Sequence, residues 1–325
     1  MKGWLLYRET AGSAKPDMYS RRRLVQVAQQ EQIDLLTYRP EQFDLVVNKE
    51  KEKKILVDGK AVPLPDFILP RTGAGTTYFT LAVIRHLEGL GVRSFNSSES
   101  IERVKDKLFT QQLLAKHNLP VPKTMLVKFP VNTDIVSKYL GFPLIVKPLS
   151  GAQGIGVFLA VSKTRFEDLM QLIEATNSKA NIILQEFVSL SKGRDLRVFT
   201  IGGHAIACME RKSKRGHLKA NYSQGSSVRK IKLTPEIKSL ASKASQILGL
   251  EIAGIDLLYD GEKFKICEAN SSPGFQGLEN CCKVDIPQAI HAYIKQTLIK
   301  RCALIDSKKT KNTNTSLTTS ILNKL

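Results

Sequence analysis

Hydrophobic and polar positions in the N-terminal part of the chain predict short strands that alternate with helices. One helix is expected from Ser20 and a second over 78–87, with strands at 3–7, 33–37, 54–57 and 66–69. Apolar residues in the second helix recur about every three positions, the spacing of one buried helical face: Tyr78, Leu81, Ile84 and Leu87. Strands separated by helices predict a mostly parallel sheet, in a first domain that ends near residue 95.

After Asn96 the pattern changes and predicts a central domain over 96–188. We expect helices over 99–117 and 164–174, and strands at 143–148 and 182–188. The apolar residues of the later helix have the i, i+3, i+4, i+7 spacing of a single packed face: Phe166, Leu169, Met170 and Ile173.

The remaining pattern predicts a third domain over 189–301. Gly202-Gly203 lies between two apolar strands, 196–201 and 205–209, and is a hairpin-turn signal. Thr234-Pro235 is typical of a helix start, and Gly249 of a helix end. The last expected elements are strands at 253–259 and 264–269 and a helix over 285–299. Residues 302–325 are polar and basic without periodicity, so we expect a disordered tail.

Composition narrows the class of protein. The 325 residues, 42% of them hydrophobic and 24% charged, are typical of a globular chain with two or three domains. The net charge of +19 favours an anionic partner such as nucleic acid, nucleotide phosphate or a glutamate-rich substrate. No apolar stretch is long enough for a secretory signal or a membrane helix, so we expect a cytoplasmic protein without a membrane partner.

The five cysteines, at 208, 267, 281, 282 and 302, fit neither a disulfide framework nor a zinc pattern. Adjacent Cys281 and Cys282 are either redox-active or soft-metal ligands, or simply reduced and partly buried thiols. We favour reduced thiols. The five histidines show no metal-ligand spacing.

Asp256, Glu268 and Asn270 are the most informative polar residues. Magnesium prefers carboxylate and carbonyl oxygens gathered from neighbouring strands. The alternative is that they are ordinary polar residues of an edge strand. The turn decides between them: a two-residue turn at Asp260-Gly261 pairs Asp256 with Lys265 and separates the two carboxylates, whereas a three-residue turn over 261–263 pairs Asp256 with Glu268. We therefore expect a turn with an odd number of residues.

Lys147 ends a predicted strand and is followed by a glycine-rich loop, 150–156. Glycine lets the backbone approach phosphate closely and lysine supplies charge, but the lysine precedes the glycines, so this is not a Walker loop. A tight structural turn is the alternative. Residues 185–188 end another strand, where they either offer backbone groups to an adenine edge or form buried strand.

Three arginines lie near these elements: Arg71, Arg197 and Arg211. The guanidinium fork binds carboxylate or phosphate and stabilises developing negative charge, and surface ion pairs are the alternative. Residues 21–23, three arginines at a helix start, have no interleaved aromatic residues. We interpret them as a solvated face rather than a nucleic-acid contact.

Together, in this order, the motifs resemble the ATP-grasp superfamily, and most closely its RimK-type glutamate ligases. The resemblance runs from about Met1 to Arg301. Its motifs are Ile68-Leu69-Pro70-Arg71-Thr72-Gly73, Lys107, Val146-Lys147, the loop 151–157, Leu184-Gln185-Glu186-Phe187, Asp195-Leu196-Arg197, Glu210-Arg211, Asn221, Gly254-Ile255-Asp256 and Glu268-Ala269-Asn270-Ser271-Ser272-Pro273-Gly274. It implies an α/β and α+β protein, an ATP-grasp fold preceded by an N-terminal parallel-sheet (pre-ATP-grasp) domain.

The resemblance also implies roles for individual residues. Phosphates would meet Lys107 and Lys147, and Arg71 would bind substrate. The adenine base would contact Gln185, Glu186, Phe187 and Val188, and the ribose hydroxyls would bind Asp195. Two magnesium ions, with manganese as a substitute, would be held by Asp256, Glu268 and Asn270. Arg197 and Arg211 would stabilise the acyl phosphate and the tetrahedral intermediate, while Lys219 and Asn221 would lie near the phosphates or the second metal.

One segment departs from the family pattern. RimK-type ligases tend to carry a basic residue where this chain has Gln224, in the loop that covers the phosphates. We therefore expect an ATP-dependent ligase that adds L-glutamate to an acidic peptide or protein C-terminus, such as that of a ribosomal protein. The sequence does not determine whether the protein is a monomer or a homo-oligomer. The alternatives are a ligase for a small carboxylate acceptor, making a dipeptide-like metabolite, and a nucleic-acid-binding protein on a degenerate ATP-grasp scaffold.

Overall fold

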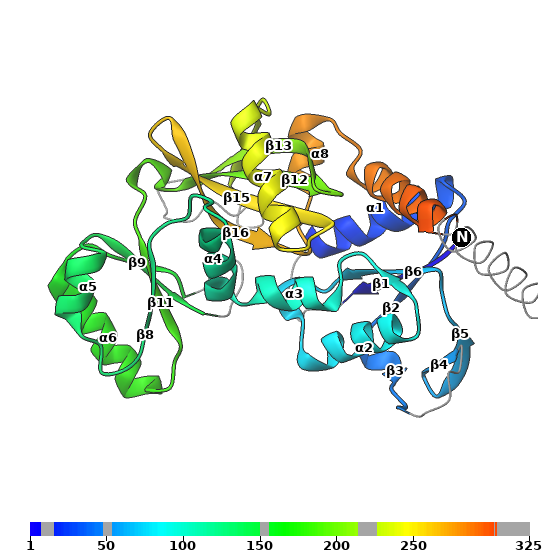
Figure 1. Cartoon of the computed structure of the whole chain (residues 1–325), viewed down its shortest axis with the longest axis horizontal. Coiled ribbons are helices and arrows are strands. Elements are labelled where there is room, and N and C mark those ends of the chain that lie inside the picture. The colour runs from blue at the N-terminus through cyan, green and yellow to red at the C-terminus, as the bar shows by residue number, and fades with distance from the viewer. Residues whose placement is uncertain (8–15, 48–53, 150–155, 214–225, 302, 304–325) are drawn as a thin grey trace, which may run out of the picture.

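The computed structural model describes residues 1–7, 16–47, 54–149, 156–213, 226–301 and 303. The strands within these ranges form four sheets. Figure 1 shows the N-terminal parallel sheet and the sheet that contains β8, β9 and β11 at opposite ends of the molecule, with the largest sheet and helix α7 between them. No helix in these described ranges is long and apolar enough to cross a membrane.

The N-terminal sheet has the order β2-β1-β6-β7, and every neighbouring pair is parallel, as the sequence predicts. Its strands are β1 (Lys2–Tyr7), β2 (Asp34–Tyr38), β6 (Phe67–Arg71) and β7 (Arg93–Ser94). Helix α1 (Pro16–Gln30) packs Leu24 with Leu5 and Leu69 on one face. Helix α2 (Tyr78–Gly89) covers the other face, so the sheet is buried on both sides.

Two expectations for this region were wrong in detail. The predicted strand at 54–57 forms, but it belongs to a separate antiparallel sheet of β3 (Phe43–Asp44), β4 (Lys54–Val57) and β5 (Lys60–Pro63). Tyr78 is 78% exposed, whereas the other three members of its predicted stripe are buried. Tyr78 is the first residue of the helix, and its ring instead contacts Arg85, whose guanidinium lies 5.4 Å from the ring centroid.

The central region forms an antiparallel sheet of order β10-β9-β11-β8. Its strands are β8 (Thr124–Val127), β9 (Leu144–Pro148), β10 (Phe158–Ala160) and β11 (Ile182–Glu186). Helices α5 (Thr133–Tyr139) and α6 (Lys163–Asn177) pack on it, with Phe166 and Met170 buried against Leu144 and Leu184. Helices α3 (Ser98–Lys105) and α4 (Lys107–Lys116) precede the sheet.

The largest sheet is antiparallel and has the order β14-β13-β12-β15-β16. Its strands are β12 (Arg194–Ile201), β13 (His204–Lys212), β14 (Ser227–Lys230), β15 (Ile252–Asp260) and β16 (Lys263–Asn270). Gly202-Gly203 makes the predicted two-residue turn, with φ of +57° and +78°. Helix α7 (Pro235–Ile247) is capped by Thr234, whose side chain accepts a hydrogen bond from the Ile237 backbone N–H, as the sequence predicts.

The C-terminal elements pack against the N-terminal sheet. Helix α8 (Gln276–Cys282) and a helix over 286–301 contribute Leu278, Ile286 and Ile290 to the core cluster that contains Leu24 and Phe199. Three short 3-10 helices complete the described elements: Pro40–Gln42, Gly73–Gly75 and Ser189–Ser191. The domain limits at 95, 188 and 301 stay predictions, and the expected tail, apart from residue 303, lies outside the described residues.

Candidate functional site

Asp256 and Glu268 face each other directly across β15 and β16. The turn that joins these strands is not the expected three-residue turn, because Asp260 pairs with Lys263 and leaves only two residues between them. Leu257 then pairs with Ile266 but Asp256 with Glu268, so Cys267 is an extra residue in β16. This β-bulge supplies the odd residue that the sequence argument assigned to the turn, and it turns Glu268 toward the face that carries Asp256.

Asn270 lies on the same face as the two carboxylates. It pairs with Gly254, and its amide nitrogen is 3.3 Å from the Gly254 carbonyl oxygen and 3.5 Å from Asp256 Oδ2. Gly254 leaves no room for a side chain, since an added Cβ would lie 2.7 Å from Pro273 Cβ and 3.0 Å from Arg197 Cδ. The glycine therefore allows Arg197 and the segment after β16 to close on this end of β15.

Arg197 and Arg211 both bind the Asp256 carboxylate. Arg197 Nη2 is 2.7 Å from Asp256 Oδ2 and its Nε contacts Oδ1, while Arg211 Nη2 lies 2.9 Å from Oδ2. Arg211 also makes a two-point contact with Asp195, at 2.7 and 2.8 Å. Four charged side chains from β12, β13 and β15 thus form one alternating network, in which Asp256 and Arg211 are each about 5% exposed.

Asp256 and Arg211 stabilise each other's charge, whereas burial and the charge of Asp256 raise the pKa of Asp195. Burial by itself raises the pKa of Asp256, but the guanidiniums of Arg197 and Arg211 outweigh it, so the pKa of Asp256 falls below its ordinary value. Burial likewise lowers the pKa of Arg211, yet Asp256 and Asp195 raise it overall. Asp256 and Arg211 therefore both keep their charge at neutral pH.

Two lysines approach this site from the central region. Lys147 on β9 is 8% exposed, and its ammonium donates to Gln185 Oε1 at 2.9 Å. Lys107 is the first residue of α4. Burial lowers the pKa of Lys107, the charge of Glu268 opposes this shift and the charge of Lys147 adds to it. Lys107 is thus electrostatically linked to both Lys147 and Glu268, residues that belong to different sheets.

The expected adenine-contacting segment has structural contacts of its own. Gln185 is buried and donates to Thr124 Oγ1 at 2.8 Å, and Glu186 accepts from Lys265 Nζ at 2.6 Å. β11 ends at Glu186, so Phe187 and Val188 follow the last residue of the strand. Side-chain contacts therefore fix the end of β11, and the chain leaves the sheet after Glu186.

Arg71 connects the N-terminal sheet to the segment that follows β16. Its Nη2 donates to the Pro273 carbonyl at 2.6 Å, and its guanidinium lies 5.8 Å from the Phe275 ring centroid. The other predicted positions, Lys219, Asn221 and Gln224, lie outside the described residues, as does loop 150–155.

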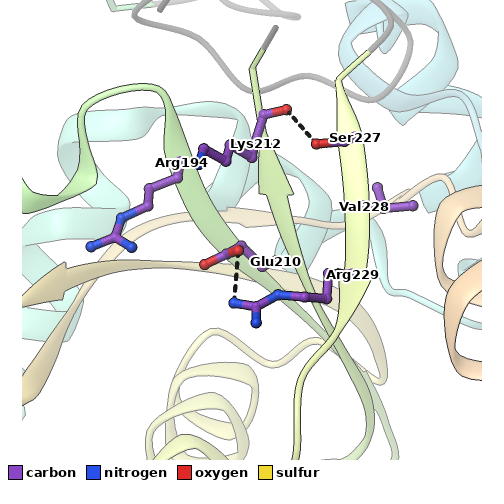
Figure 2. Close-up of a pocket in the computed structure, with 6 residues that line it drawn as sticks. All are labelled: Arg194, Glu210, Lys212, Ser227, Val228 and Arg229. Atoms are coloured by element: carbon purple, nitrogen blue, oxygen red, sulfur yellow. Dashed lines mark hydrogen bonds and ion pairs between the residues drawn. The ribbon is translucent and has the colours of Figure 1, made fainter.

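Glu210, the neighbour of Arg211 in the predicted motif, lies on the opposite face of β13. Figure 2 shows it in a pocket of about 380 Å³, lined by Arg194, Glu210, Lys212, Ser227, Val228 and Arg229. Both Glu210 oxygens have partners, Arg229 Nη2 at 3.0 Å and the Tyr259 hydroxyl at 2.6 Å. The pocket is therefore separate from the network around Asp256.

Asn96 is a structural residue that the sequence argument missed. Its amide donates to the carbonyls of Ile252 and Ser271, both at 2.8 Å, and its oxygen accepts from the backbone of Glu251 and Ile252. The side chain holds the start of β15 and the end of β16 next to β7. A lone asparagine after a strand gives no sequence signal for such a role.

The cysteines of the described residues are free, whereas the basic run 21–23 differs from its prediction. Cys208, Cys267, Cys281 and Cys282 are free, and burial raises the pKa of Cys281 to about 12, so that thiol stays protonated. Among the described residues, no three His, Cys, Asp or Glu side chains form a metal cluster. The run 21–23 is not a uniform solvated face, because only the middle arginine is exposed.

The chain is similar to proteins of known family. Residues 13–101 match the model of the RimK PreATP-grasp domain, and residues 104–294 that of the RimK-like ATP-grasp domain. A probable alpha-L-glutamate ligase 1 from Shewanella amazonensis is 34% identical over 290 residues, which cover 89% of this chain and 95% of that protein.

Solved structures share the fold. The ATP-grasp ligase PsnB, complexed with a minimal precursor, has a TM-score of 0.69 at 19% identity and covers 91% of this chain and 98% of its own. The D-alanine–D-alanine ligase from Bacillus anthracis, complexed with ATP, has a TM-score of 0.67 at 16% identity and covers 92% and 98%.

Proposed function

The chain belongs to the RimK-like ATP-grasp family of amide-forming ligases, and on that premise we propose that it adds L-glutamate to an acidic peptide or protein C-terminus. In the proposed reaction, an oxygen of the acceptor carboxylate attacks the γ-phosphorus of ATP and ADP leaves. The amine of glutamate, after losing a proton, attacks the acyl carbon. The tetrahedral intermediate then expels phosphate and leaves an amide.

The observation that carries this proposal is the convergence of Asp256, Glu268 and Asn270 on one face, with the charge of Glu268 acting on Lys107. Two carboxylates and an amide carbonyl are a suitable oxygen-donor set for magnesium. The ion would neutralise phosphate charge. Asp256 already has two guanidinium partners, whereas Glu268 makes no hydrogen bond with another described side chain. The side-chain oxygens of Glu268 and Asn270 are therefore available as metal ligands. We infer two ions, for which manganese would substitute.

The remaining roles follow from charge and position. Lys107 and Lys147 would bind phosphates, and the segment after β11, with Gln185 and Glu186 before it, would meet adenine. Asp195 holds Arg211 through both oxygens and would use its further lone pairs for the ribose hydroxyls. Arg197 and Arg211 would stabilise the negative charge of the acyl phosphate and the tetrahedral oxygen, because both are held rigidly by carboxylates. Arg71 would bind substrate, with Lys219 and Asn221 near the phosphates.

The test is ADP release by the purified protein with Mg-ATP, L-glutamate and a hexaglutamate acceptor. We expect ADP formation to require both the amine and the acceptor, and mass spectrometry to show the acceptor heavier by one or more glutamate residues. In a second series, small carboxylic acids replace hexaglutamate. ADP formation with these acids alone would indicate a ligase that makes a small metabolite. Absence of ADP with every pair, together with salt-sensitive RNA binding, would favour the nucleic-acid alternative.

A further inference from the structure

Two arginines reach the same end of the N-terminal parallel sheet from different elements. Tyr7, the last residue of β1, pairs in register with Arg71, the last residue of β6. Arg21 on α1 places its guanidinium carbon 4.4 Å from the centroid of the Tyr7 ring. Both arginines therefore lie at the carboxyl ends of parallel strands, the edge at which open α/β sheets bind ligands.

The guanidinium carbon of Arg21 lies over the Tyr7 ring, and this cation–π contact fixes the position of the side chain. A guanidinium has five N–H donors, and they are able to bind a carboxylate at two points. Among the described residues, Arg21 forms no ion pair, while Arg23 contacts Glu279 and Asp285. The charge of Arg21 is thus attracted to the Tyr7 ring, while its N–H groups form no ion pair with any described carboxylate.

This end of the sheet adjoins the segment that follows the candidate metal strand. Arg71 binds the Pro273 carbonyl and lies over Phe275, and the Tyr19 ring is 6.2 Å from the same Phe275. Pro273 comes three residues after Asn270. A ligand bound to Arg21 would therefore lie beside the end of β16, which carries Asn270, on the side that faces the N-terminal sheet.

We propose that Arg21 binds a substrate carboxylate other than the one that receives the phosphoryl group, with Arg71 next to it. This inference rests on the proposed function. The reacting carboxylate has to meet the phosphate near Asp256 and Glu268, whereas Arg21 lies on helix α1 and contacts Tyr7 at the end of the N-terminal sheet. L-Glutamate and an acidic acceptor both carry a second carboxylate, and a bidentate guanidinium contact selects for it over a neutral group.

The test compares Arg21→Ala with Arg22→Ala, the exposed neighbour on the same helix. KM values are measured for Mg-ATP, L-glutamate and hexaglutamate. We expect Arg21→Ala to raise one substrate KM by about tenfold to a hundredfold, the range of a charged hydrogen-bonded contact. The KM for ATP should stay within about twofold, and Arg21→Lys should recover only part of the loss. A rise for L-glutamate assigns the carboxylate to the incoming amino acid, and a rise for hexaglutamate assigns it to the acceptor.

Direct binding separates failure of this inference from failure of the proposed function. Fluorescein-labelled hexaglutamate and radiolabelled L-glutamate are titrated against each protein with Mg and a non-hydrolysable ATP analogue. If the wild type forms no ADP but Arg21→Ala binds one probe at least tenfold more weakly than Arg22→Ala does, the proposed reaction fails and the carboxylate site stands. If both variants bind and turn over alike, or the wild type binds neither probe, the inference is overturned.

Discussion

Asp256 and Glu268 lie opposite each other because β16 contains one extra residue, Cys267, between Glu268 and the hairpin turn. Without that bulge the two-residue turn would pair Asp256 with Cys267 and direct Glu268 to the other face. The candidate metal site therefore depends on a local irregularity of the ladder. Bulges often redirect a side chain in this way near functional sites.

Glu268→Gln should abolish ADP formation while the protein stays folded. The substitution keeps the shape of the side chain but removes the negative charge that would hold a divalent ion. The measurements are ADP release over a range of magnesium concentrations and the thermal melting temperature. Glu262→Gln, an exposed change in the neighbouring turn, is the control. Near-normal turnover of Glu268→Gln would exclude it as a metal ligand.

Arg211→Lys should lower kcat by about 100-fold, because a lysine keeps the charge but loses the planar fork that spans Asp195 and Asp256. Steady-state ADP release measures this. Arg229→Lys, on the opposite face of the sheet, should change kcat by less than about twofold. Equal effects of the two substitutions would contradict the assignment of Arg211 to the reacting centre.

Gly254→Ala should destabilise the protein by about 1–3 kcal/mol, since the added methyl would overlap Pro273 and Arg197. Gly274→Ala serves as the control because an added Cβ there meets nothing within 4 Å. Urea unfolding of both variants gives the comparison. If Gly254→Ala unfolded at the same urea concentration as the wild type, the added methyl would not clash with Pro273 and Arg197 as expected.

Asn96→Ala should lower the free energy of unfolding by at least about 2 kcal/mol, because four hydrogen bonds to β15 and the segment after β16 are lost and buried backbone groups are left without partners. Asn181→Ala, at an exposed position, should change it by less than about 0.5 kcal/mol. Chemical denaturation measures both. If the two variants had similar free energies of unfolding, the hydrogen bonds of Asn96 would not be what holds β15 next to β7.

His291 should make stability depend on pH below about 6.5. Burial lowers the pKa of His291 from its ordinary value of 6.5, although the hydrogen bond between its Nε2 and the Leu24 carbonyl raises it in part. As the pH falls below 6.5, the unfolded chain takes up a proton that the folded chain does not. Stability should therefore decrease on acidification, by at most about 1.4 kcal/mol per pH unit.

The check is the free energy of unfolding between pH 7.5 and 5.5 for the wild type, His291→Gln and the exposed control His204→Gln. His291→Gln should flatten the dependence in this window, and His204→Gln should leave it as in the wild type. An unchanged slope in His291→Gln would assign the effect to other groups.

Local patterns were sufficient for most of the secondary structure. Caps, turn residues and hydrophobic periodicity act over a few positions, and they were sufficient for the Thr234-Pro235 start of α7, the Gly202-Gly203 turn and strands β1, β2 and β6 of the parallel sheet. The sequence analysis missed the short strands β3, β5, β7, β8, β10 and β14 and the helices α5 and α8. Such short elements are stabilised by the neighbours they pair with or pack against rather than by their own pattern.

The sequence by itself determined which residues we propose for the site, since Asp256, Glu268, Asn270 and the two lysines are recognisable from their residue types and their order along the chain. Tertiary structure alone decided how they meet. The bulge at Cys267 sets which face Glu268 takes, and the Arg197–Asp256–Arg211 contacts join strands that are distant along the chain. The reason is physical: strand register and ion pairing depend on the whole sheet, because each contact exists only when strands from separate segments are packed together.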